Sequence, residues 1–215
     1  MAKQLLLVRH GTVGELYVGT YVGRTDLPLS LEGRRTVEPL AEWLAGRKIG
    51  RAWCSPKLRA RQTADIIAAR RPSLSFAFDD NLREVDFGQW ELMAFPQIAA
   101  EYPGQVARWV EAGDDFVFPG GERIGDFRAR VAAAATGLAA DPADIVLAVC
   151  HAGVIREMIC HLLGLNGPRG ATSGVFSDAH LFKVRNATCS TIDLFDGKGV
   201  LAGLNLPSPG VWEGT

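Results

Sequence analysis

Residues 5–12 read Leu-Leu-Leu-Val-Arg-His-Gly-Thr, and this stretch decides the predicted fold. Four apolar residues in a row, without polar alternation, are typical of a strand that is buried on both faces of a sheet. The run ends abruptly at Arg9-His10-Gly11. In open parallel sheets, ligands bind outside the carboxyl ends of the strands. The stretch therefore predicts a buried strand that carries polar side chains at a ligand-binding edge.

A second stretch repeats this arrangement late in the chain. Residues 145–149 are the strongest strand candidate, and Cys150-His151-Ala152-Gly153 follows them directly. A helix is predicted after this turn, over residues 154–163. Two predicted strands thus end in a histidine, and we expect both histidines at the same edge of the sheet.

Between these stretches, the apolar pattern changes repeatedly from helical to strand spacing. Helical spacing covers residues 31–44, and Gly46 is the expected C-cap. Ser55-Pro56 is typical of a helix start, with Ser55 as N-cap and Pro56 in the first helical position. This helix is expected to end before Pro72. The other predicted elements are a helix over 127–138 and strands over 51–54, 74–78, 181–184, 190–195 and 200–204.

Strands that alternate with helices predict an α/β fold. We expect a three-layer sandwich in which helices flank a mixed, mostly parallel sheet. Residues 79–123 are irregular and rich in aromatic, proline and glycine residues, so we interpret them as a small lid over the carboxyl ends of the strands. One domain is expected over residues 1–206, and residues 207–215 are interpreted as a tail.

Composition excludes several classes of protein. The 215 residues carry a formal net charge of −1, which argues against a nucleic-acid-binding protein, because such proteins usually present a basic face. No apolar stretch approaches the ~20 residues that a membrane span needs, and the N-terminal run is too short for a signal peptide. The four cysteines lack metal-binding spacing, so free buried thiols are expected. These features predict a cytoplasmic protein with no nucleic-acid or membrane partner.

His10 is the first candidate for catalysis. A neutral imidazole has an exposed lone pair and can attack phosphorus. Arg9 beside it can bind the phosphate, and Gly11 lets the backbone approach closely. A histidine at a strand end is more often structural, so this motif alone does not establish a site.

Three further segments supply groups that phosphoryl transfer needs. Arg59 lies in the first turn of a predicted helix, where its guanidinium and the helix N-terminus can act on one anion. Glu84 is the candidate proton donor for the leaving oxygen, whereas Asp86 and Glu91 are interpreted as loop anchors. His151 can donate to the phosphate, together with backbone amides of the turn that follows it.

Together these motifs resemble the histidine phosphatase superfamily, the phosphoglycerate mutase-like group. The resemblance extends from Leu7 to about Leu204, and four motifs occur in family order: L-V-R-H-G, S-P-x-x-R-A-x-Q-T-A, L-x-E-x-D-F-G-x-W-E and H-A-G-V-I-R. Each motif is modest alone, but four in order are highly specific. The resemblance implies the phosphoglycerate mutase-like form of the α/β sandwich and metabolite phosphoesters as substrates.

The resemblance also implies a role for each matching residue. His10 is expected to become phosphorylated, and Glu84 to protonate the leaving group and then activate the hydrolytic water. The implied catalytic residues are His10, Glu84 and His151, and the implied phosphate-binding residues are Arg9, Arg59, Gly11 and Ala152. Two arginines and a protonated His151 can offset the phosphoryl charge, and the histidines lack metal-ligand spacing. We therefore expect no metal and no other cofactor.

Some positions depart from the family pattern. Thr12-Val13 stands where the family usually has Glu or Gln and then Thr or Ser, and we expect these residues to line the pocket mouth. Arg156 is interpreted as a member of a structural ion pair.

The chain is short for a mutase, which favours a phosphatase. F-G-x-W-E, residues 118–122 and H-A-G-V-I-R look most similar to the α-ribazole phosphatase branch of cobalamin biosynthesis, so α-ribazole 5'-phosphate is the substrate hypothesis.

Two alternatives stay open at this point, a phosphoglycerate mutase-type phosphomutase and a non-catalytic phospho-ligand-binding protein. The presence of Glu84 argues against the second, because a binding module needs no proton donor. Five lid aromatics are candidates for substrate contacts, although such residues more often pack: Phe87, Trp90, Phe95, Tyr102 and Trp109. The sequence leaves the oligomeric state open, a homodimer included.

Overall fold

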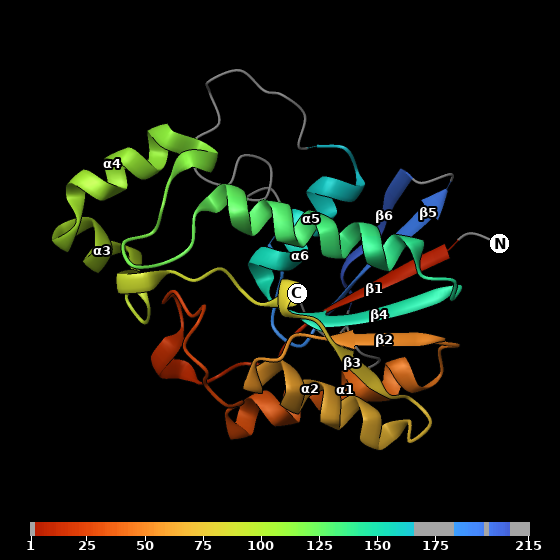
Figure 1. Cartoon of the computed structure of the whole chain (residues 1–215). Coiled ribbons are helices and arrows are strands. Elements are labelled where there is room, and N and C mark those ends of the chain that lie inside the picture. Colours follow the sequence, from red (N-terminus) through yellow and green to blue (C-terminus); the bar gives the residue numbers. More distant parts are fainter. Residues whose placement is uncertain (1–2, 166–182, 196–197, 207–215) are drawn as a thin grey trace.

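The structure is a computed structural model of the 215-residue chain, and it describes residues 3–165, 183–195 and 198–206. Its centre is a sheet with the strand order β3-β2-β4-β1-β5-β6 (Figure 1). The strands are β1 (Lys3–Arg9), β2 (Arg51–Cys54), β3 (Phe76–Phe78), β4 (Ile145–Cys150), β5 (Cys189–Phe195) and β6 (Lys198–Leu206). Strands β1 to β4 pair in parallel, whereas β5 and β6 are antiparallel to their neighbours. The predicted mixed, mostly parallel sheet is confirmed.

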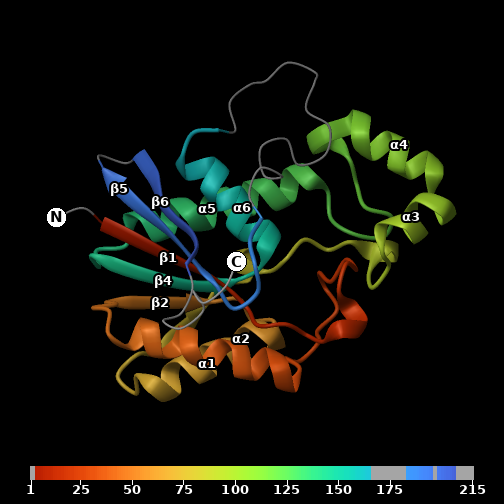
Figure 2. The ribbon, with the colours of Figure 1, turned by 180° about the vertical axis from the view of Figure 1, so that it is seen from behind.

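Helices cover both faces of the sheet, as Figure 2 shows from behind. One face carries α1 (Leu31–Ala45) and α2 (Leu58–Arg70), and the other carries α5 (Ile124–Ala140) and α6 (Ala152–Leu162). The three-layer α/β architecture is therefore confirmed.

Strand β1 explains why its sequence is apolar without alternation. Leu5 and Leu7 belong to the apolar core beneath α5 and α6. Leu6 and Val8 belong to the separate core beneath α1 and α2. Successive side chains of a strand point to opposite faces, so a strand between two cores needs apolar residues at every position.

The expected boundaries of α1 hold because its ends are satisfied locally. Ser30 Oγ accepts a hydrogen bond from the Gly33 N–H at 2.9 Å, which caps the first turn. The helix ends at Ala45, and Gly46 is the C-cap.

The predicted start of α2 is wrong. The helix begins at Leu58 rather than Pro56, and Lys57 occupies the N-cap without a side-chain hydrogen bond. Ser55 Oγ accepts a hydrogen bond from the Lys57 N–H at 3.4 Å, and it also lies 2.8 Å from Nε2 of His151 on the neighbouring strand end. The hydroxyl of Ser55 therefore has a contact distant in sequence as well as its local one.

The segment expected to form the lid consists of short helices and turns. They are η2 (Asp80–Leu82), η3 (Gly88–Trp90), α3 (Phe95–Glu101), α4 (Pro103–Ala112) and η4 (Gly113–Asp115). Figure 1 shows α3 and α4 beyond the carboxyl ends of β1 and β4. Trp90, Trp109 and Phe118 are buried in the same core as the residues beneath α5 and α6. The segment is thus packed onto the domain through aromatic side chains.

The C-terminal part differs from the prediction at one strand. Of the strand expected over 181–184, residues 181 and 182 lie outside the described residues, and Lys183 and Val184 are in no strand. The carbonyl oxygen of Val184 accepts instead from the Arg9 side chain at 2.6 Å. The predicted strands over 190–195 and 200–204 correspond to β5 and β6. The expected tail at 207–215 lies outside the described residues.

Two further expectations concern the cysteines and the membrane. All four cysteines are free and buried, as expected from their spacing. Within the described ranges, none of the helices is long and apolar enough to cross a membrane.

Candidate active site

Sheet register brings the two candidate histidines together. β1 and β4 pair in parallel with Arg9 opposite Cys150, so the residues that follow each strand are also neighbours. The His10 N–H donates to the Cys150 carbonyl oxygen at 3.1 Å. The imidazole centroids of His10 and His151 lie 5.0 Å apart in an edge-to-face arrangement. The prediction that both histidines share one sheet edge is confirmed.

The hydrogen-bond partners of His10 determine which ring nitrogen carries the hydrogen. Nδ1 lies 2.7 Å from the Gly11 carbonyl oxygen, which can only accept. Nε2 accepts a hydrogen bond from Arg59 Nε at 3.2 Å. Nδ1 is therefore protonated and Nε2 has the lone pair. Burial, followed by the positive charges of Arg59 and Arg9, lowers the pKa of His10 well below 6.5, so the ring is neutral at pH 7.

Arg59 links the nucleophile candidate to a neighbouring loop. Its side chain is fully buried at the start of α2. Nη1 donates to the Thr25 carbonyl oxygen at 2.9 Å, and Nη2 donates to that of Gly23 at 2.9 Å. Burial lowers the pKa of Arg59, but a guanidinium stays charged at pH 7. One arginine thus fixes both His10 and the segment 22–25.

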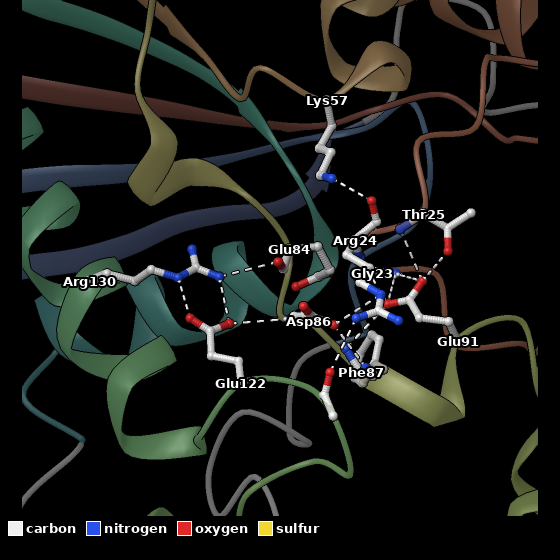
Figure 3. A network of polar contacts seen from close by, with 12 residues as sticks. Gly23, Arg24, Thr25, Lys57, Glu84, Asp86, Phe87, Glu91, Glu122 and Arg130 are labelled. Atoms are coloured by element: carbon white, nitrogen blue, oxygen red, sulfur yellow. Dashed lines mark hydrogen bonds and ion pairs between the residues drawn. The ribbon is translucent and has the colours of Figure 1, made fainter.

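The same loop is held from its other side by Glu91. The carboxylate accepts from the backbone N–H groups of Gly23, Arg24 and Thr25, as Figure 3 shows. In the neighbouring loop, which carries Glu91 itself, the Asp86 carboxylate accepts from the Gly88 N–H at 2.8 Å. The interpretation of Glu91 and Asp86 as loop anchors is confirmed.

Arg9 has a donor left over for an anion. Its Nη1 donates to the Val184 carbonyl oxygen at 2.6 Å. Its Nε is buried and has no hydrogen-bond partner among the described residues. Burial lowers the pKa of Arg9 to about 10, and the nearby carboxylate of Glu84 acts in the opposite direction. The side chain therefore remains cationic at pH 7.

His151 presents a second unused donor or acceptor. Its Nε2 lies 2.8 Å from Ser55 Oγ, whereas its buried Nδ1 has no partner among the described residues. Burial, followed by the charge of Arg59, lowers the pKa of His151 well below 6.5. This pKa describes the site without a phosphoryl group, so the expected protonated imidazole beside a bound phosphoryl group stays a prediction. A neutral ring can still donate from Nδ1 when Ser55 donates to Nε2.

Glu84 reaches the site from the segment that follows η2. Its Oε2 accepts from the Gly153 N–H at 3.0 Å, and its Oε1 accepts from the Val85 N–H at 3.1 Å. Gly153 belongs to the first turn of α6, where backbone N–H groups lack helical partners and favour a carboxylate. The proton-donor candidate is thereby held at the end of the strand that positions His151.

A cavity of about 580 Å³ opens over these groups. Arg9, His10, Glu84 and Ala152 line it, whereas Arg59 and His151 are fully buried and contact His10. Thr12 and Val13 also line the cavity, as expected. Its apolar and aromatic wall consists of Tyr17, Val18, Tyr21, Val22, Phe87 and Phe95. The cavity is large enough for a small-molecule ligand.

Gly11 has a packing role in the structure. A Cβ at this position would lie 2.5 Å from the Gly33 carbonyl oxygen. The Gly11 N–H donates to Thr63 Oγ1 at 3.2 Å, and the described residues that line the cavity do not include Gly11. Its expected contact with phosphate stays a prediction.

Only part of the lid's aromatic set faces the cavity. Phe87 and Phe95 line it. Trp90 and Trp109 are buried and stack edge-on with centroids 5.4 Å apart, and Tyr102 packs against their core. Most of these aromatic residues therefore pack in the core, as aromatic residues at such spacing were expected to do more often than contact a substrate.

Arg156 and Asn186 are among the cavity side chains that were not predicted from the sequence. Arg156, interpreted as part of a structural ion pair, lines the cavity and its charge lowers the pKa of Arg9. Asn186 also lines the cavity, and its Nδ2 donates to the His10 carbonyl oxygen at 3.1 Å. Asn186 follows no motif, so the sequence carried no signal for it. Arg156 is four positions after Ala152, one helical turn into α6, and that spacing was the available signal.

The acidic, cysteine and histidine side chains do not converge on a metal site. Within residues 3–165, 183–195 and 198–206, no group of three or more His, Cys, Asp or Glu residues is arranged to hold a metal ion.

Replacing Gly153 with alanine tests the position of Glu84. The new Cβ would lie 2.4 Å from Glu84 Oε1, so the carboxylate must move. Because a displacement of about 1 Å can cost ~10²-fold in rate, we expect kcat for an alkyl phosphate ester to fall by about that factor. Steady-state phosphate release measures this.

Gly137→Ala is the matched control for this variant. Gly137 lies in α5, and nothing would contact a Cβ there within 4 Å. Alanine is the better helix former, so this variant should keep full activity and gain about 0.5–1 kcal/mol of stability. Unchanged turnover in Gly153→Ala would show that the Glu84 carboxylate does not need this position.

Comparison with known proteins identifies relatives over the whole described domain. The family model described as "Histidine phosphatase superfamily (branch 1)" matches residues 5–207. Phosphoserine phosphatase 1 of Hydrogenobacter thermophilus is 29% identical over 208 residues, which cover 94% of this chain and 92% of the relative. The adenosylcobalamin/alpha-ribazole phosphatase of Salmonella typhimurium is 30% identical over 211 residues, which cover 98% of each protein.

A solved structure is similar over the same extent. The alpha-ribazole phosphatase of Shigella flexneri superposes with a TM-score of 0.79 at 25% sequence identity. The match covers 98% of this chain and 100% of that protein. The expected phosphoglycerate mutase-like fold is thus confirmed at the level of the whole domain.

Proposed function

This chain belongs to the histidine phosphatase superfamily and is a phosphatase, and we propose that it hydrolyses a small-molecule phosphomonoester through a phosphohistidine on His10. The observation that carries the proposal is the state of His10. Its neutral ring has the lone pair on Nε2, Arg59 contacts that nitrogen, and the charges of Arg59 and Arg9 both act on the ring. A nucleophile with cationic neighbours is what attack on an anionic phosphoryl group requires.

In the first step, a bond forms between His10 Nε2 and phosphorus while the ester P–O bond breaks. The protonated Glu84 carboxyl gives its proton to the leaving oxygen. In the second step, the Glu84 carboxylate takes a proton from water, whose oxygen attacks phosphorus as the N–P bond breaks. Phosphate leaves, and His10 and Glu84 return to their starting states.

The charge of the phosphoryl group is offset by protein donors in this mechanism. Arg59 Nε, which donates to His10 Nε2 in the ligand-free site, turns its hydrogen to a phosphoryl oxygen once Nε2 is bonded to phosphorus. Arg9 Nε and His151 Nδ1 are buried without partners among the described residues and supply two further donors. These groups take the part that Mg²⁺ has in other phosphoryl-transfer enzymes, so the activity is metal-independent.

The cavity wall favours a substrate whose leaving group is apolar. Tyr17, Tyr21, Phe87 and Phe95 line the space beyond the catalytic groups. A phosphoserine molecule offers these rings little to contact, whereas a nucleoside phosphate with an aromatic base can stack against them. Of the substrates in the names of the relatives, α-ribazole fits this wall better than phosphoserine. We therefore propose α-ribazole 5'-phosphate as the substrate.

A substrate panel in the presence of EDTA tests the activity, its metal independence and the substrate together. We expect release of phosphate from p-nitrophenyl phosphate without added metal, and inhibition by vanadate. The kcat/KM for α-ribazole 5'-phosphate should exceed that for phosphoserine and for 3-phosphoglycerate by roughly tenfold or more, because only the first fills the apolar wall.

For each part of the proposal, a different result of this substrate panel would contradict it. Turnover that EDTA abolishes and Mg²⁺ restores would contradict metal independence. A preference for phosphoserine would contradict the substrate. Isomerisation of a phosphoglycerate in the presence of a bisphosphate primer, without phosphate release, would show a mutase instead. Phosphate binding without turnover of any ester would show a binding protein.

A further inference from the structure

Arg130 of α5 lies beside the segment that carries Glu84 (Figure 3). Its Nη1 donates to the carbonyl oxygens of Asn81 at 2.9 Å and Arg83 at 2.6 Å. Its Nη2 donates to the carbonyl oxygen of Glu84 itself at 3.2 Å. One guanidinium therefore gathers three backbone carbonyls immediately before and at the candidate proton donor.

Glu122 fixes Arg130 in this orientation. Its two carboxylate oxygens accept from Arg130 Nε at 2.7 Å and Nη2 at 2.9 Å, which is the fork-to-fork geometry of a strong pair. The side chains are only 16% and 17% exposed. Glu122 Oε2 also accepts from the Asp86 N–H at 3.3 Å. The pair thus grips the segment on both sides of Glu84.

Other contacts also hold the segment: Leu82 and Val85 are buried in the core, and the Asp86 carbonyl oxygen accepts from the Glu122 N–H at 2.9 Å. Glu84 itself is less enclosed. Glu84 lines the large cavity and also a second cavity of about 250 Å³, so open space borders it twice. The carboxylate itself is held by Gly153, at the far end of the side chain. The Val85 N–H of the same segment also donates to the carboxylate, but the partners from outside the segment come from different elements, α5 for the main chain and α6 for the carboxylate.

We propose that Arg130 and Glu122 are positioning residues for Glu84, and this inference rests on the proposed function. They hold residues 81–86 so that the Glu84 carboxyl lies where it can pass its proton to the ester oxygen as the P–O bond breaks. The same position lets the carboxylate take the proton back from water in the second step. Neither residue contacts the substrate in this scheme.

The geometry requires arginine at position 130. A lysine keeps the charge and can still pair with Glu122, but its single ammonium lacks the planar fork that reaches three carbonyl oxygens and two carboxylate oxygens together. Arg130→Lys therefore keeps the positive charge but removes most of the hydrogen bonds that the guanidinium makes.

The test compares two esters that differ in their need for a proton. The phenolate of p-nitrophenyl phosphate leaves without protonation, whereas the alkoxide of an alkyl phosphate needs a proton from Glu84. We measure kcat/KM, because it reports only the first step, whereas kcat also includes the second step that both esters share. For Arg130→Lys, we expect kcat/KM to fall about 10²-fold with the alkyl ester but less than about threefold with p-nitrophenyl phosphate. Glu122→Gln should show the same selectivity in weaker form, and it serves if Arg130→Lys does not fold.

Glu84→Gln provides the reference for this selectivity, and a double variant shows whether the two residues act together. The kcat/KM of Glu84→Gln should fall far more with the alkyl ester than with p-nitrophenyl phosphate. Adding Arg130→Lys to Glu84→Gln should cause no further selective loss, because the group that Arg130 positions is already absent. Additive selective losses would overturn the inference.

Two variants on the same helix control for charge and for stability. Arg123→Lys changes an exposed arginine that pairs with Asp115 and Asp126, and it should leave both activities unchanged. Val131→Ala truncates a fully buried core residue next to Arg130, so it should lower the melting temperature without leaving-group selectivity. Equal losses with both esters in Arg130→Lys, as in any merely destabilised variant, would overturn the inference.

The failure of the inference can be told from the failure of the proposed function. If Glu84→Gln is selective and Arg130→Lys is not, Arg130 has no positioning role and the proposed chemistry stands. If the kcat/KM of Glu84→Gln itself falls equally with both esters, Glu84 is not the proton donor of the first step, and the positioning role falls with it.

Discussion

Replacing His10 with alanine is expected to lower kcat by roughly 10⁴-fold or more, the scale seen when an enzyme loses its nucleophile. The reason is that Nε2 of His10 is the group that forms the bond to phosphorus, and its lone pair is available because Nδ1 carries the hydrogen. His151 cannot substitute, because its Nε2 is engaged with Ser55. Phosphate release from p-nitrophenyl phosphate measures the loss.

Two further readouts separate lost chemistry from lost folding in this variant. The wild-type enzyme, quenched during turnover, should carry a phosphoryl group that is labile in acid and stable in base, as an N–P bond is. His10→Ala should carry none. The variant should nevertheless bind phosphate, because Arg9, Arg59 and His151 remain, and phosphate should still raise its melting temperature.

His161→Ala is the matched control, since His161 of α6 lies outside the cavity and contacts Thr136. It should keep full activity. Residual turnover of more than a few per cent in His10→Ala would place the nucleophile elsewhere. An acid-stable phosphoenzyme in the wild type would point to a serine, threonine or tyrosine ester instead.

The fold and the centre of the site were predictable because their signals are local. The apolar runs at 5–8 and 145–149 indicate burial on both faces, and a histidine lies two positions after the end of each run. The rule that parallel strands present their carboxyl ends at one edge then places His10 beside His151. The register of β1 on β4 confirms this step.

What the sequence did not reveal depends on contacts between distant residues. The local pattern at Ser55 predicted a helix cap, and nothing in that pattern indicates that its hydroxyl also contacts His151, 96 positions away. Arg130 looked like one more charge on an alanine-rich helix, and its partners at Asn81 and Glu84 are more than 45 positions earlier. Periodicity describes which face of a helix is buried, and it contains no information on what a long polar side chain reaches across a loop. Such residues emerge only once the chain is folded.

Replacing Arg59 with methionine is expected to be nearly as damaging as removing the nucleophile. We expect kcat/KM to fall by ~10³-fold, because a buried cation that contacts both His10 and the phosphoryl position is lost. The carbonyl oxygens of Gly23 and Thr25 also lose their donor, which should cost about 3 kcal/mol of stability. Denaturant unfolding and initial rates measure the two losses separately.

The pH profile makes this prediction specific to Arg59. The charge of Arg59 is the second cause, after burial, that lowers the pKa of His10, so its removal raises that pKa towards 6.5. A higher pKa means that His10 becomes protonated, and unable to attack, at a higher pH. The acid limb of kcat/KM should therefore move up in Arg59→Met. It should stay in place in Arg59→Lys, which keeps the charge but loses the fork.

The pH profiles of all variants are measured with the same ester. The ionisation of the ester then affects each profile equally, and differences between profiles come from the enzyme. Arg70→Met is the matched control, because Arg70 lies on the same helix and pairs with Glu38 at the surface. It should leave both the rate and the acid limb unchanged. An acid limb that does not move in Arg59→Met would assign that limb to a group other than His10, and would remove the electrostatic link between Arg59 and the nucleophile. A limb that moves equally in the methionine and lysine variants would attribute it to the lost hydrogen bond at Nε2 rather than to charge.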